Sequence, residues 1–182
     1  TVIVVVRHDS QGAIGIIINR PIGERPLASL LKALGDETTA ATGTVVYNNT
    51  FAGGIAAAFG VTIGAGGTGS LVKNNIFATA KGVSVAADAA TDTVVDYNLY
   101  YLTGTGTMFA WNGSNYTTYA DWRTASSQDA HSATGSPLFI GSVDYTYRLS
   151  SGSPARDVGT SLGFTSDYLF VPVPKGLLPD LG

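Results

Sequence analysis

The sequence predicts an all-β fold, a short right-handed parallel β-helix, from three observations: an internal repeat, a composition rich in glycine and poor in charge, and short segments with period-two alternation. The repeat is a six-residue phrase that occurs at 46–51, 72–77 and 95–100. Its equivalent asparagines, Asn49, Asn75 and Asn98, are 26 and 23 residues apart. A fixed period of about 20 to 50 residues is typical of solenoid proteins.

Equivalent positions of successive coils in such a fold stack about 4.8 Å apart. The phrase therefore predicts an aliphatic stack, an amide ladder and an aromatic stack. These comprise Val46, Val72 and Val95; Asn49, Asn75 and Asn98; and Phe51, Phe77 and Tyr100. Asparagine suits the turn position because its backbone tolerates a left-handed conformation and its amide bonds neighbouring backbone. Residues 60–64 and 82–86 alternate with period two and supply the other faces of the coils.

Composition narrows the class of protein. The 182 residues suffice for one domain with a short appendage, and only 13% are charged, with a formal net charge of −3. This balance excludes a nucleic-acid binder, which needs clustered Lys and Arg to neutralise phosphates. With no cysteine and only His8 and His131, we expect no metal site and no cofactor.

The composition is also typical of a soluble extracellular or periplasmic protein. Hydroxyl and amide side chains supply most of its polarity, and glycine is abundant. Its longest apolar runs are far shorter than the roughly 20 residues that span a bilayer. We therefore expect no membrane insertion. The chain begins at Thr1 without a signal segment, which predicts a processed chain or a fragment.

The first 43 residues differ in pattern from the rest. Two β-branched runs, 1–6 and 14–18, flank a polar turn at 8–12 and predict a hairpin. Pro26, four leucines at helical spacing and Gly35 predict a short amphipathic helix over 27–34. We expect hairpin and helix to cap the first coil, because an open β-helix exposes an apolar end. The sequence thus predicts two parts, residues 1–43 and 44–182.

The first part resembles the N-terminal region of the AlgH/YqgE family of small bacterial proteins. The resemblance rests on segments that occur in the same order and spacing: Arg7-His8-Asp9, Gly12-Ala13-Ile14-Gly15, Ile18-Asn19-Arg20-Pro21 and Leu27-Ala28-Ser29-Leu30-Leu31. It implies no catalytic residue for this segment, and we expect a polar hairpin tip at His8 and Asp9.

The second part resembles the C-terminal end of right-handed parallel β-helix proteins of the pectate-lyase-like superfamily. The repeat carries this resemblance together with the order of the later segments: Ser136-Pro137-Leu138-Phe139, 144–149, 151–159 and 179–182. It implies a relation to bacterial polysaccharide lyases or related carbohydrate-active proteins. Such enzymes usually have more coils than the three or four expected here, so the chain is expected to be a fragment without a complete active site.

One position of the repeat varies in chemistry, namely Tyr47, Lys73 and Asp96. Each follows an inward valine and should face solvent on adjacent coils. Proton abstraction next to a uronate carboxylate needs a base and a cation that neutralises the carboxylate. Lys73 and Asp96 are therefore candidate catalytic residues and Tyr47 a candidate substrate contact. The alternative is an exposed ion pair that contributes little to stability.

A second group of candidate substrate-binding residues lies after the repeat. It is rich in aromatic side chains, which stack on sugar rings, and in groups that bond hydroxyls or carboxylates. Its members are Trp111, Tyr116, Tyr119, Trp122, Arg123 and His131. The alternative is that these aromatics pack the loop onto the wall of the fold.

The sequence thus predicts a carbohydrate-interacting β-helix domain related to polysaccharide lyases, with a polysaccharide as the partner. Whether it is an enzyme stays open. The alternatives are a non-catalytic structural or adhesive solenoid, which could form oligomers through its open ends, and a chimeric chain without a single function.

Overall fold

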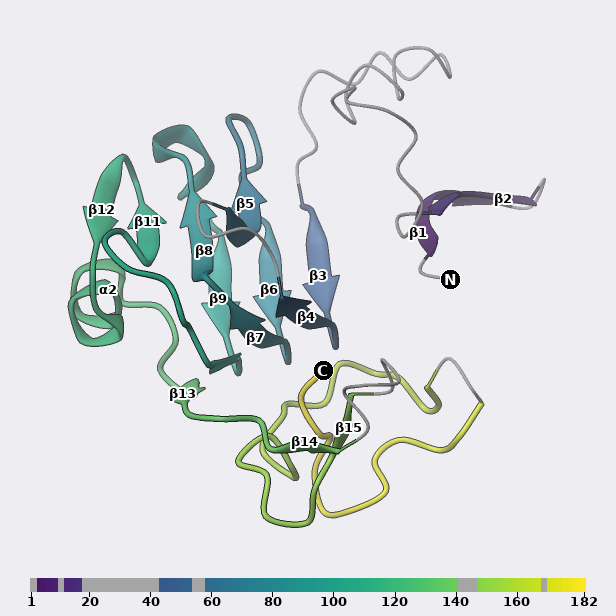
Figure 1. Ribbon diagram of the computed structural model, residues 1–182. Coiled ribbons are helices and arrows are strands. Elements are labelled where there is room, and N and C mark those ends of the chain that lie inside the picture. The colour runs from purple at the N-terminus through teal and green to yellow at the C-terminus, as the bar shows by residue number, and fades with distance from the viewer. Residues whose placement is uncertain (1–2, 10–11, 18–42, 54–57, 141–146, 168–169) are drawn as a thin grey trace. The chain divides into compact units, whose positions relative to one another are not determined.

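The computed structural model describes residues 3–9, 12–17, 43–53, 58–140, 147–167 and 170–182 (Figure 1). The chain divides into two units, Thr1–Thr39 and Ala40–Gly182. In the first unit, strands β1 (Ile3–Asp9) and β2 (Gly12–Ile17) pair antiparallel, which confirms the predicted hairpin. The predicted helix over 27–34 and its role as a cap lie outside the described residues.

The second unit contains three larger sheets, to which each copy of the repeat contributes in turn (Figure 1). The first is parallel and consists of β3 (Val45–Tyr47), β6 (Leu71–Lys73) and β9 (Val94–Asp96). The second is parallel and consists of β4 (Thr50–Gly53), β7 (Ile76–Thr79), β10 (Leu99–Tyr100) and β13 (Ala133–Thr134). The third is mixed and consists of β5 (Phe59–Ile63), β8 (Lys81–Val85), β11 (Phe109–Trp111) and the antiparallel β12 (Ser114–Tyr116).

Helical structure interrupts the sheets. A 3-10 turn, η1 (Ala87–Ala89), follows β8, and helix α2 (Tyr119–Ser126) follows β12. Thr118 caps α2 by accepting a hydrogen bond from the Asp121 N–H, and Ser127 ends it in a left-handed conformation. A two-stranded antiparallel sheet comes later, formed by β14 (Phe139–Ile140) and β15 (Arg148–Leu149).

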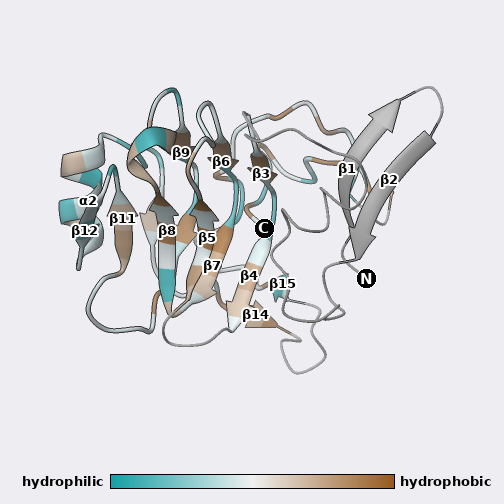
Figure 2. Ribbon diagram, turned by 90° about the horizontal axis from the view of Figure 1, so that it is seen from above, coloured by the Kyte–Doolittle hydropathy of each residue, from teal (hydrophilic) through white to brown (hydrophobic). Residues whose placement is uncertain are grey.

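The predicted stacks of the repeat are confirmed. Val46, Val72 and Val95 pair in register, and Val72 and Val95 are fully buried. The ring of Phe77 lies between the other two aromatic rings. Its centroid is 5.0 Å from that of Phe51 and 5.1 Å from that of Tyr100, and the ring planes are nearly parallel in both cases. These apolar stacks form the interior, and Figure 2 shows β7 in brown while α2 carries hydrophilic residues in teal.

The predicted amide ladder is confirmed as well. The backbone N–H and the side-chain amide of Asn75 both donate to Asn98 Oδ1, at 3.0 and 3.1 Å. Asn49 makes the same pair of bonds to Asn75 Oδ1, at 3.0 and 3.3 Å. At the far end, the Asn98 N–H donates to the Ser132 hydroxyl and its amide to Asp129. The ladder therefore continues into residues outside the repeat.

The predicted class, an all-β right-handed parallel β-helix, is wrong. The described residues form several parallel and mixed sheets together with helix α2, no closed solenoid is found among them, and a layered α/β arrangement fits better. The physical reason is that the repeat ends after its third copy. Beyond Tyr101 the chain turns back on itself as the β11–β12 hairpin, and α2 packs Trp122 into the core. In the described ranges no helix has the length and apolarity needed to cross a membrane.

Candidate functional site

The candidate site is a line of side chains across the parallel sheet of β3, β6 and β9. Tyr47 pairs with Lys73, and Lys73 pairs with Asp96, so one side chain from each strand lies beside the next. All three are half-buried, whereas their neighbours Val72 and Val95 point into the core. His131 extends the line beyond Asp96. We call these four residues the outer row.

Asp96 holds His131 in a fixed position. Asp96 Oδ2 lies 2.7 Å from His131 Nδ1, while Asp96 Oδ1 accepts hydrogen bonds from the backbone N–H groups of His131 and Tyr97, at 2.8 and 2.9 Å. The Asp96 side chain is only 15% exposed and that of His131 is 60% exposed. The pair thus presents the outer edge of the imidazole to solvent with its orientation set by a carboxylate.

Tyr97 completes the support of His131, and the sequence analysis missed it. Its ring stacks on the imidazole with centroids 4.6 Å apart and planes 9° apart. Tyr97 has a φ of 55°, a conformation that costs energy for a residue with a bulky side chain. The equivalent residues of the other two copies are Asn48 and Asn74, which also have positive φ. Comparing the three copies at this position would have marked Tyr97 as the exception.

Lys73 lies in the middle of the outer row. Asp96 is its neighbour on the next strand, but no ion pair joins the two side chains in the part of the chain that the structure describes. The predicted pair of catalytic residues is therefore brought together without being bonded. Asp96 already accepts three hydrogen bonds, which leaves Lys73 as a charge available to a ligand.

Except for His131, the second predicted group lies away from the outer row, on β11, β12 and α2. Trp122 is fully buried, with its ring 5.1 Å from that of Phe109. It has no exposed surface for a sugar ring, which corrects its prediction as a substrate contact. The physical reason is that α2 turns this indole inward as a core residue.

Of the other members of this group, the aromatic residues are partly buried and the arginine bonds to the backbone. Trp111, Tyr116 and Tyr119 are half-buried against the same core. Arg123 is exposed and donates to the Ala130 carbonyl at 2.9 Å. Their role as substrate contacts stays a prediction, and the contacts match the alternative that these aromatics pack the loop onto the fold.

The sequence analysis did not single out Asp129, a buried carboxylate that lies between the aromatic group around Trp122 and the loop that carries His131. Asp129 is fully buried and accepts hydrogen bonds from four side chains: Trp122 Nε1, Tyr100 Oη, Ser132 Oγ and Asn98 Nδ2. Burial raises the pKa of Asp129 to about 6, although these hydrogen bonds act in the opposite direction. Burial also raises the pKa of Tyr100 well above its usual value, and the Asp129 charge adds to that effect. The arrangement is an internal anchor rather than a site open to substrate.

Across the described residues, no group of three or more His, Asp or Glu side chains is placed to hold a metal ion. No protein-family model, no curated protein and no solved structure matches this chain. The resemblances to the AlgH/YqgE family and to pectate-lyase-like proteins accordingly stay predictions.

Proposed function

We propose that this protein binds an acidic polysaccharide along the outer row. The observation that carries the proposal is the alignment of Tyr47, Lys73 and Asp96 on neighbouring strands, with His131 held beside Asp96 at one end. Strands of a sheet lie about 4.8 Å apart, so the row offers contacts at regular intervals along a direction perpendicular to the strands. A linear polymer with repeating units suits such a surface better than a compact small molecule does.

The chemistry of the row favours an acidic sugar. Lys73 offers an ammonium group that no described carboxylate pairs with, and a uronate carboxylate would fill that place. The Asp96 carboxylate is already engaged by three nitrogen atoms, the backbone nitrogens of Tyr97 and His131 and the ring Nδ1 of His131. Tyr47 at one end and the Tyr97–His131 stack at the other provide ring surfaces for the apolar faces of sugars.

Elimination of the bound uronate is a second candidate function, and the Asp96–His131 pair favours it. A lyase must remove the proton next to the carboxylate. Asp96 fixes His131 through Nδ1 and leaves Nε2 without a partner among the described residues, so the imidazole is better suited to this step than the engaged carboxylate of Asp96. Absorbance of the unsaturated product from polygalacturonate or alginate would detect it.

The binding proposal is tested with Lys73→Gln. Titration calorimetry with polygalacturonate should show affinity reduced about tenfold, because one charge-assisted contact is lost, and a weaker dependence of affinity on salt. Lys81→Gln is the matched control: Lys81 is also half-buried but lies on β8, over the ring of Phe59. Its affinity should equal that of the unmodified protein.

Two outcomes would overturn the proposal. One is that the protein binds none of several acidic polymers, including polygalacturonate, alginate and hyaluronan. The other is an equal loss of affinity in the Lys73 and Lys81 variants, which would mean that net charge, and not the outer row, determines binding.

A further inference from the structure

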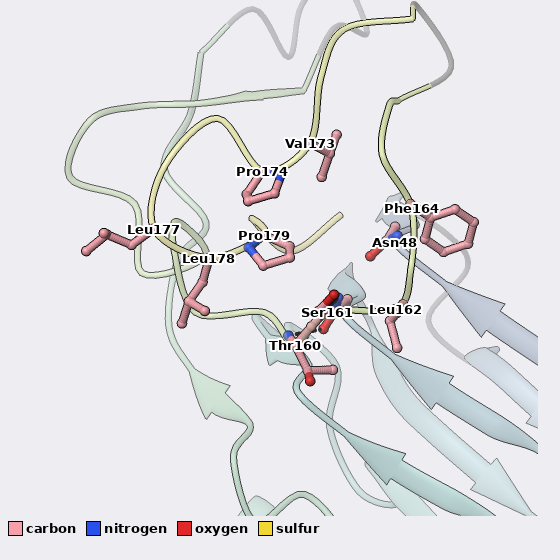
Figure 3. Close-up of a pocket in the computed structure, with 11 residues that line it drawn as sticks. Asn48, Thr160, Ser161, Leu162, Phe164, Val173, Pro174, Leu177, Leu178 and Pro179 are labelled. Carbon is pink, nitrogen blue, oxygen red and sulfur yellow. Dashed lines mark hydrogen bonds between the residues drawn. The ribbon is translucent and has the colours of Figure 1, made fainter.

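A small cavity adjoins the Tyr47 end of the outer row (Figure 3). Its volume is about 120 Å³, several times the roughly 15 Å³ that one water molecule needs. Asn48, the residue after Tyr47, forms part of its wall, and Phe164, another wall residue, makes an edge-to-face contact with the Tyr47 ring at 6.5 Å. A ligand on the outer row can therefore reach into this cavity with one substituent.

The walls of the cavity are held in place by hydrogen bonds. Asn74 pairs with Thr160 twice, through its amide to the Thr160 carbonyl and through its Oδ1 to the Thr160 N–H, at 2.8 and 2.9 Å. On the opposite side, the Leu177 N–H donates to Asp157 Oδ1 at 3.0 Å. The Val173 N–H donates to the Thr165 carbonyl. The cavity is thus preformed, which lowers the entropic cost of binding.

Asn48, in the wall of the cavity, carries a hydrogen-bond acceptor for which the described part of the chain offers no donor. Its Oδ1 is buried and has no hydrogen-bond partner among the described residues. The equivalent atom one strand along, Asn74 Oδ1, accepts from Thr160. A buried acceptor without a donor costs free energy that a ligand donor would recover. Figure 3 shows Asn48 facing the space between Ser161 and Pro179.

The rest of the lining is mostly apolar. Leu162, Phe164, Val173 and Pro174 supply hydrocarbon surface, and Ser161 adds one exposed hydroxyl. The occupant that matches this lining is a small neutral group with one N–H or O–H donor and a methyl-sized apolar end.

We infer that the cavity receives the acetamido group of an N-acetylated sugar, an inference that rests on the proposed binding of a polysaccharide to the outer row. The amide N–H would donate to Asn48 Oδ1, the methyl would lie against Leu162 and Val173, and the carbonyl would accept from the Ser161 hydroxyl. A sugar hydroxyl has no apolar end to fill the space. A methyl ester or an O-acetyl group has no donor for Asn48. The partner is therefore an acidic polymer that contains N-acetylated sugars.

The experiment uses hyaluronan oligosaccharides, in which N-acetylglucosamine alternates with a uronate, and the same oligosaccharides after N-deacetylation. The measured quantity is the ratio of the two dissociation constants, obtained by calorimetry. Asn48→Gly removes the acceptor and tolerates the φ of 53° at this position. Asn112→Gly is the matched control, because Asn112 has a φ of 50° and lies at the tip of the β11–β12 hairpin, away from the cavity.

We expect the unmodified protein and the Asn112 variant to share one ratio in favour of the acetylated form. In the Asn48 variant this ratio should fall about tenfold, as a lost buried hydrogen bond predicts. Equal ratios in all three proteins, with binding retained, would overturn the acetamido inference and leave the proposed function intact. The same result is expected if the cavity holds only water. If the unmodified protein binds none of hyaluronan, polygalacturonate and alginate, the proposed function itself is overturned.

Discussion

Trp122 Nε1 donates a hydrogen bond to Asp129 Oδ2 at 2.6 Å, and both side chains are fully buried. The contact ties helix α2 to the loop that carries His131. Because Asp129 also accepts from Asn98, the same carboxylate ends the amide ladder of the repeat. Residue 129 therefore connects the sheets, the helix and the outer row.

The first prediction concerns the pH dependence of stability through Asp129. Its pKa is about 6 in the folded protein and about 3.9 in an unfolded chain. The folded state therefore holds a proton between about pH 4 and 6 that the unfolded chain has lost. The resulting stabilisation is complete below about pH 4 and is lost as pH rises through 6, a change of about 3 kcal/mol.

Urea unfolding of the unmodified protein and of Asp129→Asn, from pH 4 to pH 8, measures this effect. Other carboxylates titrate equally in both proteins, so their contributions cancel in the difference between the two unfolding free energies. As pH rises, the free energy of unfolding of the unmodified protein should fall relative to that of the Asp129→Asn variant. A difference that is independent of pH would show that Asp129 does not titrate in this range.

The second prediction concerns the amide ladder. Asn75→Ala removes the amide that donates to the Val46 and Lys73 carbonyls, at 2.8 and 2.9 Å, and the oxygen that accepts from Asn49. These buried or half-buried groups would lose their partners, so the free energy of unfolding should fall by about 3 kcal/mol. Asn115→Ala, at an exposed position of β12, should change it by less than about 0.5 kcal/mol. Equal effects of the two substitutions would contradict a structural role for the ladder.

The third prediction concerns the fit between Gly82 and Phe109. A Cβ at residue 82 would lie 2.5 Å from Phe109 Cε1, and the Phe109 ring cannot retreat because Trp122 stacks on it at 5.1 Å. Gly82→Ala should therefore destabilise the fold by about 2 kcal/mol through overpacking. Gly64→Ala is the control, since nothing lies within 4 Å of the added atom. Thermal unfolding of both variants distinguishes this steric effect from the general effect of replacing glycine.

What the sequence predicted well depends on local chemistry repeated at a fixed interval. Equivalence of Asn49, Asn75 and Asn98 was enough to predict the ladder, because identical side chains in register bond in the same way each time. The hairpin of the first unit followed equally from a polar turn between two β-branched runs. Such features need no knowledge of distant contacts.

The errors and omissions arise where distant segments meet. Asp96 and His131 are 35 residues apart, and only the return of the chain after α2 brings them together. Trp122 looks like a ligand contact in an aromatic stretch, but helical geometry turns it inward. Three copies of the repeat predict a continuing solenoid, but after Tyr101 the chain forms the β11–β12 hairpin and helix α2 instead.

The final prediction exploits the strain at Tyr97. Asn48 and Asn74 occupy the same left-handed position in the other copies, and asparagine tolerates this conformation better than tyrosine does. Tyr97→Asn should therefore leave stability unchanged or raise it by up to about 1 kcal/mol. It should also weaken polysaccharide binding five- to tenfold, because the ring that stacks on His131 is lost. Tyr101→Asn, at a position 44% exposed and outside the outer row, should bind as the unmodified protein does. Urea unfolding and calorimetry on the same preparations separate the two effects, and a variant that loses stability while keeping its affinity would show that Tyr97 serves the fold instead of the ligand.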